Sequence, residues 1–169
     1  MSMEEEKRNG SDIMQKHLRN LLKDPPHLLK NFHYEDTLAF LELGEQIRFV
    51  EGDIILREDE YVNSAYLIAT GKVSIWKENI QLATLESKNF LGETFLFSKN
   101  NRLAKVRCEE DCILLQYDRY ETLNYFRKRP EKLFNIFTKN IIEIQQNKIS
   151  IMNSQLFALK KRFLDDKKW

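Results

Sequence analysis

The residues of this chain that could do chemistry lie in one short segment, residues 92–104. Arg102 follows Glu93 by nine positions, and Gly92 precedes that glutamate. A guanidinium is permanently charged and planar, so Arg102 could form paired hydrogen bonds with a phosphate-type anion. Gly92 would let the backbone approach that anion, and a short helix starting at Glu93 or Thr94 would point backbone N–H groups at it. The alternative is an ordinary surface ion pair between Glu93 and Arg102.

The other reactive side chains form no recognisable catalytic or metal-binding pattern. All three histidines precede residue 34, and the motifs of serine hydrolases and zinc proteases do not occur. Cys108 and Cys112 are too few for a structural zinc site, so we expect reduced thiols in or near the core. The sequence leaves open a catalytic site assembled only by folding. We predict no enzyme activity, no cofactor and no metal.

Short segments rich in β-branched and aromatic residues surround residues 92–104 and must position them. Turn signals such as Glu51-Gly52-Asp53 and Thr70-Gly71-Lys72 separate several of these segments. Many short strands with turns between them are typical of a β-sandwich or roll. The predicted strands are Ile47–Phe49, Ile54–Leu56, Tyr66–Ala69, Val73–Trp76, Gln81–Leu85, Leu103–Cys108 and Cys112–Tyr117.

Helical patterns precede the strands. Residues 1–10 are charged and read as a flexible tail. A first helix is expected over about residues 11–23, where Pro25-Pro26 ends it. A second helical stretch covers about residues 27–43, with a break near His33.

Helical patterns also follow the strands. Asp118 is expected to cap one helix, with Glu121 completing a capping box, and Pro130 to open a long helix. Residues 154–163 are expected to form one more helix. The long helix carries apolar residues in a heptad-like seam. The seam consists of Phe134, Phe137, Ile141, Ile144, Lys148 and Ile151.

This order of elements predicts an α+β fold. We expect an antiparallel β-roll, a double-stranded β-helix of jelly-roll type, with N-terminal helices and a long C-terminal helix. The domain with its flanking helices is placed at residues 11–153, between the tail at 1–10 and a C-terminal helical tail at 154–169.

The composition fits a soluble globular chain. Of the 169 residues, 42% are hydrophobic and 31% charged, with 27 basic and 26 acidic residues giving a net charge of +1. Without a basic excess, and with room for no helix pair after residue 151, we expect no DNA binding. No stretch approaches the roughly 20 apolar residues of a membrane helix. We expect no membrane partner and a cytoplasmic location.

The segment from Phe90 to Phe97, followed by Arg102-Leu103-Ala104, resembles the phosphate-binding cassette of cyclic nucleotide-binding domains. The family pattern is Phe-Gly-Glu, a short helix, a variable turn, then arginine, a small residue and alanine. The turn glycines Gly52 and Gly71 also suit the family's β-roll. The resemblance extends from about residue 28 to residue 150.

The resemblance implies a ligand, cAMP or cGMP, and a role for each residue of the cassette. Arg102 and the backbone of the cassette would hold the cyclic phosphate, and Glu93 would accept a hydrogen bond from the ribose hydroxyl. The implied ligand-binding residues are Gly92, Glu93, Thr94, Arg102, Leu103 and Ala104.

Two positions depart from the family pattern. Phe95 and Leu103 stand where the family usually has small residues. Both would narrow the pocket, unless their side chains point into the core. The family's serine or threonine after the arginine is linked to guanine recognition, so Leu103 favours cAMP over cGMP.

The sequence therefore predicts a non-catalytic cyclic-nucleotide sensor. Ligand binding would be relayed through the C-terminal helices to an unknown protein partner or to a homodimer formed through the 134–151 helix. Packing of that seam against the chain's own β-roll is the alternative for the helix. For the function, the alternative is a degenerate fold that binds no nucleotide and serves as a protein-interaction or dimerisation module.

Overall fold

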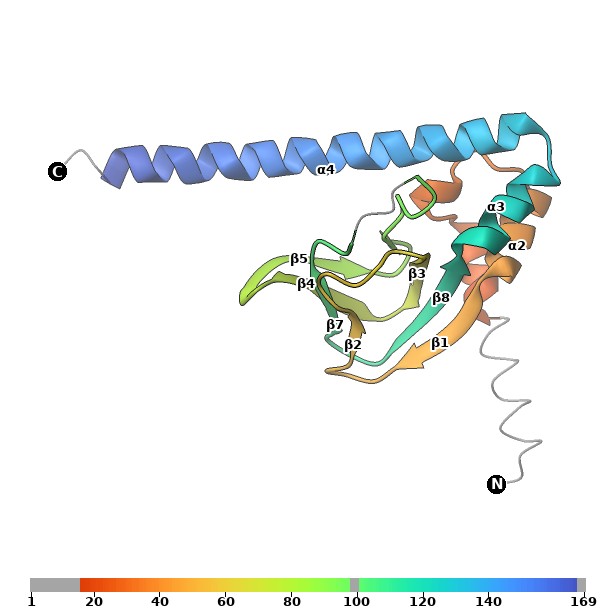
Figure 1. The fold of residues 1–169 in the computed structure, drawn as a ribbon, viewed down its shortest axis with the longest axis horizontal. Coiled ribbons are helices and arrows are strands. Elements are labelled where there is room, and N and C mark those ends of the chain that lie inside the picture. Colours follow the sequence, from red (N-terminus) through yellow and green to blue (C-terminus); the bar gives the residue numbers. More distant parts are fainter. Residues whose placement is uncertain (1–15, 98–100, 167–169) are drawn as a thin grey trace, which may run out of the picture.

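The computed structural model describes residues 16–97 and 101–166, which form two antiparallel sheets with helices from both ends of the sequence gathered on one side of them (Figure 1). Residues 16–23 are helical. The remaining elements are η1 (His27–Leu29), α2 (Tyr34–Leu43), β1 (Glu45–Phe49), β2 (Ile54–Leu56), β3 (Ser64–Thr70), β4 (Lys72–Lys77), β5 (Ile80–Glu86), β6 (Phe90–Leu91), β7 (Lys105–Cys108), β8 (Cys112–Asp118), α3 (Arg119–Arg127) and α4 (Glu131–Asp166).

The strands form a β-roll. One sheet has the order β1-β8-β3-β6 and the other β2-β7-β4-β5, so the chain crosses repeatedly between them. All the recorded strand pairs are antiparallel, for example Ile47 opposite Leu114 and Ile75 opposite Val106. The predicted α+β fold with an antiparallel roll is confirmed.

Strands β3 and β8 are buried on both faces, because the side chains of a strand alternate between the two sides of its sheet. On one side, Leu67 and Leu115 pack in the cluster that includes the helices. On the other side, Ile68 and Leu114 pack inside the roll against residues of the second sheet. At the turn between β3 and β4, Gly71 has a φ of +95°, and a Cβ there would lie 2.8 Å from the Asp111 carbonyl oxygen. The predicted turn glycine is therefore required by both conformation and space.

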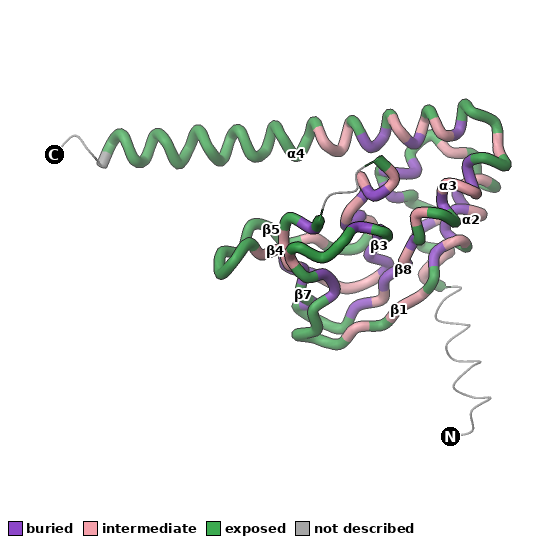
Figure 2. The backbone as a smooth tube through the Cα atoms, viewed as in Figure 1, coloured by how far each residue is buried: buried purple, intermediate pink, exposed green. Residues whose placement is uncertain are grey.

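The helices are joined to the first sheet by aromatic rings. Phe40 of α2 stacks on Tyr117 of β8 with ring centroids 4.8 Å apart, and Phe126 of α3 lies 4.7 Å from Phe137 of α4. Asp118 caps α3, as predicted, because its carboxylate accepts hydrogen bonds from the backbone N–H groups at positions 120 and 121. The contact between Phe126 and Phe137 holds the first half of α4, which is partly buried (Figure 2).

The two halves of α4 differ in burial. Phe137 and Ile141 are buried, whereas all residues from Gln146 to Asp165 are exposed. Figure 1 shows this second half extending past the strands. The separate helix predicted over residues 154–163 is wrong, because α4 runs without a break from Glu131 to Asp166. None of the helices in the described parts of the chain is long and apolar enough to cross a membrane.

The remaining differences from the sequence prediction are small. The stretch at 27–43 is divided as expected, with His33 as the N-cap of α2. The two-residue strand β6 was not predicted, and β7 begins at Lys105 instead of Leu103. The predicted tail at 1–10 and the start of the first helix lie outside the described residues.

Candidate functional site

A cavity of about 420 Å³ lies between the roll and α4. All six residues singled out from the sequence line it: Gly92, Glu93, Thr94, Arg102, Leu103 and Ala104. One part of its wall is apolar, formed by side chains of β2, β4, β5 and β7: Leu56, Ile75, Leu85 and Val106. A cavity with an apolar wall and a few charged groups suits a ligand that combines a flat ring with an anion.

Arg102 is a buried cation in this cavity, with 7% of its surface exposed. Its backbone is fixed by two hydrogen bonds, because its N–H donates to the Glu60 carbonyl and its own carbonyl accepts from the Asp59 N–H. Its guanidinium Nη2 donates to the carbonyl oxygen of Ser64 at 2.6 Å. Among the described residues, no carboxylate forms an ion pair with Arg102.

Burial has an electrostatic consequence for this group. Desolvation lowers the pKa of the Arg102 guanidinium, while Tyr66 and Glu60 act in the opposite direction. An arginine nevertheless stays protonated near neutral pH. The cavity wall therefore holds a positive charge that forms no ion pair with a carboxylate of the described residues, and a buried charge is costly unless an anion binds it.

Gly92 lies directly against this guanidinium. Its φ is +71°, a conformation that other residues avoid, and a Cβ at this position would lie 2.2 Å from Nη1 of Arg102. Any side chain at position 92 would therefore displace the arginine. The glycine lets the backbone and the guanidinium occupy adjacent space.

Glu93 is also buried, with 3% of its surface exposed, but side chains of the same protein bind its carboxylate. Its Oε1 accepts a hydrogen bond from Nε2 of Gln145 at 2.6 Å and forms an ion pair with Nζ of Lys148. Both donors belong to α4. The alternative of a surface ion pair between Glu93 and Arg102 is wrong, because both residues are buried and have different partners.

The segment after Gly92 is a series of turns. Phe95 N–H donates to the Gly92 carbonyl and Phe97 N–H to the Thr94 carbonyl, both at 2.9 Å. The short helix predicted to begin at Glu93 or Thr94 is wrong for residues 93–97, which form turns. Residues 93–97 therefore offer an anion no helix dipole, and Arg102 is the one cation among residues 92–97 and 101–104.

The two bulky departures from the family pattern have different positions. Phe95 is 1% exposed and packs in the core, as one alternative expected. Leu103 is 81% exposed and lines the cavity from its rim, so the expectation of a core position is wrong for it. Phe95 is not among the residues that line the cavity.

Sequence reasoning missed the residues that α4 contributes, Gln145 and Lys148. Lys148 was interpreted only as a weak point in the apolar seam. The available signal was a pair of polar residues three positions apart, which share one face of a helix, next to otherwise apolar seam positions. Their distance from the cassette in sequence gave no indication of the contact.

The cysteines lie away from the cavity lining. Both are free and buried, and burial raises the pKa of Cys108 to about 12 and raises that of Cys112. In the ranges 16–97 and 101–166, no group of three or more histidine, cysteine or carboxylate side chains could hold a metal ion.

Comparison with protein families gives one match. Residues 46–129 match the model of the cyclic nucleotide-binding domain. These residues run from β1 to the end of the segment after α3, and they include both Glu93 and Arg102.

Curated proteins with similar sequences include protein kinases. The chain is 33% identical over 113 residues to cGMP-dependent protein kinase 2 of Homo sapiens, which covers 63% of this chain and 15% of the kinase. It is 36% identical over 66 residues to the cGMP-dependent protein kinase of Plasmodium berghei, covering 39% of this chain and 8% of that protein. The chain thus spans a small part of these relatives.

Solved structures show the same fold. The Thermus thermophilus catabolite activator protein matches with a TM-score of 0.68 and 21% identity, over 79% of this chain and 63% of that one. The cAMP-bound PfPKA-R matches with a TM-score of 0.58 and 18% identity, over 79% of this chain and 49% of that one.

Proposed function

We propose that this chain, whose residues 46–129 belong to the cyclic nucleotide-binding domain family, senses a cyclic nucleotide by binding it in the cavity between the roll and α4. The observation that carries the proposal is the buried guanidinium of Arg102, which lines the cavity and forms no ion pair with a carboxylate of the described residues. The function is regulatory: binding itself is the signal, and no reaction is required.

Each part of a cyclic nucleotide has a complementary group in the cavity. The cyclic phosphate would bind Arg102, which offers a charged, planar fork of donors. The ribose hydroxyl would donate to Glu93. The base would lie along the apolar wall that includes Ile75 and Val106.

We further infer a preference for cAMP over cGMP. Leu103 carries no hydroxyl with which to recognise guanine, and its exposed side chain at the rim adds apolar surface near the base. Two curated relatives are named as cGMP-dependent kinases, so both nucleotides belong in the test.

The signal would pass to a protein partner or to a second copy of the chain through α4. The seam expected at 134–151 is used largely by the chain itself, since Phe137 and Ile141 are buried and Phe134 and Ile144 pack against the same core. The exposed half of α4 instead carries an apolar stripe spaced 3, 4, 3 and 4 residues apart. The apolar stripe consists of Ile149, Met152, Leu156, Leu159 and Phe163.

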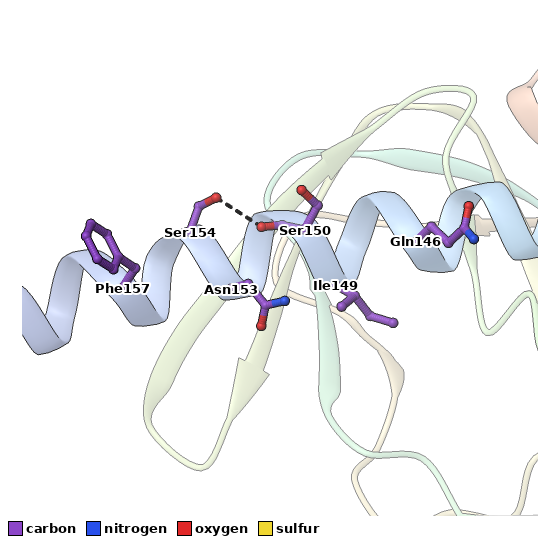
Figure 3. Close-up of a pocket in the computed structure, with 6 residues that line it drawn as sticks. All are labelled: Gln146, Ile149, Ser150, Asn153, Ser154 and Phe157. Atoms are coloured by element: carbon purple, nitrogen blue, oxygen red, sulfur yellow. Dashed lines mark hydrogen bonds between the residues drawn. The ribbon is translucent and has the colours of Figure 1, made fainter.

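This half of α4 also carries a shallow hollow. Figure 3 shows that side chains of α4 alone line it, among them Ile149 and Asn153. One helix cannot enclose a ligand, so we assign this surface to protein contact.

A second candidate function is a protein-interaction module that binds no nucleotide. The observation that favours it is the ion pair between Glu93 and Lys148, which already satisfies one oxygen of the carboxylate proposed to bind ribose. Under this alternative, the cavity would be closed permanently by α4.

Calorimetric titration with cAMP and cGMP distinguishes the two functions. We expect saturable binding by the wild type and a loss of about 2 kcal/mol or more in Arg102→Ala, because a charged hydrogen bond in a buried site is lost. Arg107→Ala is the matched control, since Arg107 is an exposed arginine on β7 and does not line the cavity. No binding by folded wild-type protein at millimolar nucleotide would favour the interaction module.

A further inference from the structure

Only one of the two carboxylate oxygens of Glu93, Oε1, is bound by the described residues. Gln145 Nε2 and Lys148 Nζ both bind Oε1, from positions 52 and 55 residues further along the chain. Oε2 accepts from none of the described residues, and it is not among the polar atoms sealed from solvent without a partner. Because Glu93 lines the cavity, Oε2 is the oxygen available to a ligand there.

The two α4 donors are held in place by the rest of the helix. Gln145 and Lys148 lie three residues apart on one face of α4. The preceding turns of α4 are anchored, because Ile141 is buried in the core and Asn140 Nδ2 donates to the carbonyl oxygens of Leu28 at 3.0 Å and Lys30 at 2.7 Å. Gln145 is half-buried and all residues from Gln146 to Asp165 are exposed, so the pair lies at the boundary between the packed and the exposed half of α4.

We propose that Gln145 and Lys148 are positioning residues for the ligand: they fix the carboxylate of Glu93 through Oε1 so that Oε2 faces the cavity as the acceptor for a ribose hydroxyl. A buried carboxylate without a partner would turn toward another donor. Lys148 supplies the opposite charge and Gln145 a second fixed donor, and together they select one orientation. This inference rests on the proposed function.

The arrangement couples α4 to the ligand. The donors can orient Glu93 only while α4 is docked, so a bound nucleotide favours the docked helix. By linkage, the factor by which docking of α4 tightens nucleotide binding equals the factor by which a bound nucleotide favours docking.

The test compares cAMP with 2′-deoxy-cAMP, which lacks the ribose hydroxyl. Titration of Lys148→Met is expected to show about a tenfold loss of affinity for cAMP, as for one charged hydrogen bond. For 2′-deoxy-cAMP, the loss relative to wild type is expected to be less than about twofold. Lys148→Arg should recover most of the cAMP affinity, and Lys139→Met is the control at an exposed position of the docked half.

A double-mutant cycle with Glu93→Gln makes the test stricter. If Lys148 acts through Glu93, then Lys148→Met has little further effect on cAMP affinity in a Glu93→Gln background. Equal losses for cAMP and 2′-deoxy-cAMP, or full additivity with Glu93→Gln, would overturn the positioning role and leave the proposed function intact. Absence of cAMP binding by the wild type would overturn both.

Discussion

Arg102 and Glu93 line the same cavity, but their charged groups have different kinds of partner. The carboxylate of Glu93 has two partners from α4, whereas the guanidinium of Arg102 has one backbone carbonyl and no described carboxylate. A buried charge with an internal partner contributes to the folded state, while one without such a partner is a cost that an external anion can relieve. The comparison shows that Glu93 is connected to α4, and it supports the proposal that Arg102 binds the anion of the ligand.

The largest effect is expected from closing the space beside Arg102. In Gly92→Ala, the new Cβ would lie 2.2 Å from Nη1, so the guanidinium must move away from its position in the cavity. We expect a loss of cAMP affinity of at least about tenfold, and a loss of about 1–2 kcal/mol in the free energy of unfolding from the strained φ. Calorimetry and chemical denaturation measure the two quantities.

Gly52→Ala is the matched control for that variant. Gly52 has a φ of +89° but nothing within 4 Å of its virtual Cβ. The Gly52→Ala variant should therefore lose about as much free energy of unfolding from strain as Gly92→Ala, and should keep the wild-type affinity for cAMP. Equal affinity losses in both variants would show that strain in the roll, and not contact with Arg102, disturbs the site.

A smaller effect on nucleotide binding is expected from the exposed half of α4, which lies beyond the residues that contact Glu93. Leu156→Glu places a charge in the apolar stripe and should abolish self-association or partner capture, while cAMP affinity changes by less than about twofold. Sedimentation velocity measures the association of the wild type and the variant. Ala158 is exposed, lies on roughly the opposite face of the helix and lies outside the hollow, so Ala158→Glu should have no effect. A loss in both variants would indicate a general charge effect.

The smallest effect concerns a group outside the cavity. Burial raises the pKa of Cys108 to about 12, so folding favours the neutral thiol. Its contribution to stability is complete below the unfolded pKa of about 8.5 and is lost as pH rises from there toward 12. The free energy of unfolding should therefore fall above about pH 9, and less steeply in Cys108→Ala. An identical pH profile in that variant would exclude the thiol as a cause.

Much of the fold and half of the site could be predicted from the sequence. Strands such as β8 were visible because Leu114 and Leu115 lie in a run of apolar residues, and residues 92–104 are close enough in sequence to be recognised together. The contribution of α4 was not predictable, because Lys148 lies 55 residues from Glu93 and only the packing of α4 brings them together. Exposure of Leu103 also depends on the path of the turn before β7, which no periodicity describes.

The most direct test of the account is the stability of Arg102→Met with and without cAMP. If Arg102 serves the ligand, the empty variant should unfold within about 1 kcal/mol of the wild type, or be more stable, because a buried unpaired charge is removed. Saturating cAMP at 100 times its dissociation constant should stabilise the wild type by about 2.7 kcal/mol and the variant by far less. A variant that is strongly destabilised without ligand, and is still stabilised by cAMP as much as the wild type, would contradict the account.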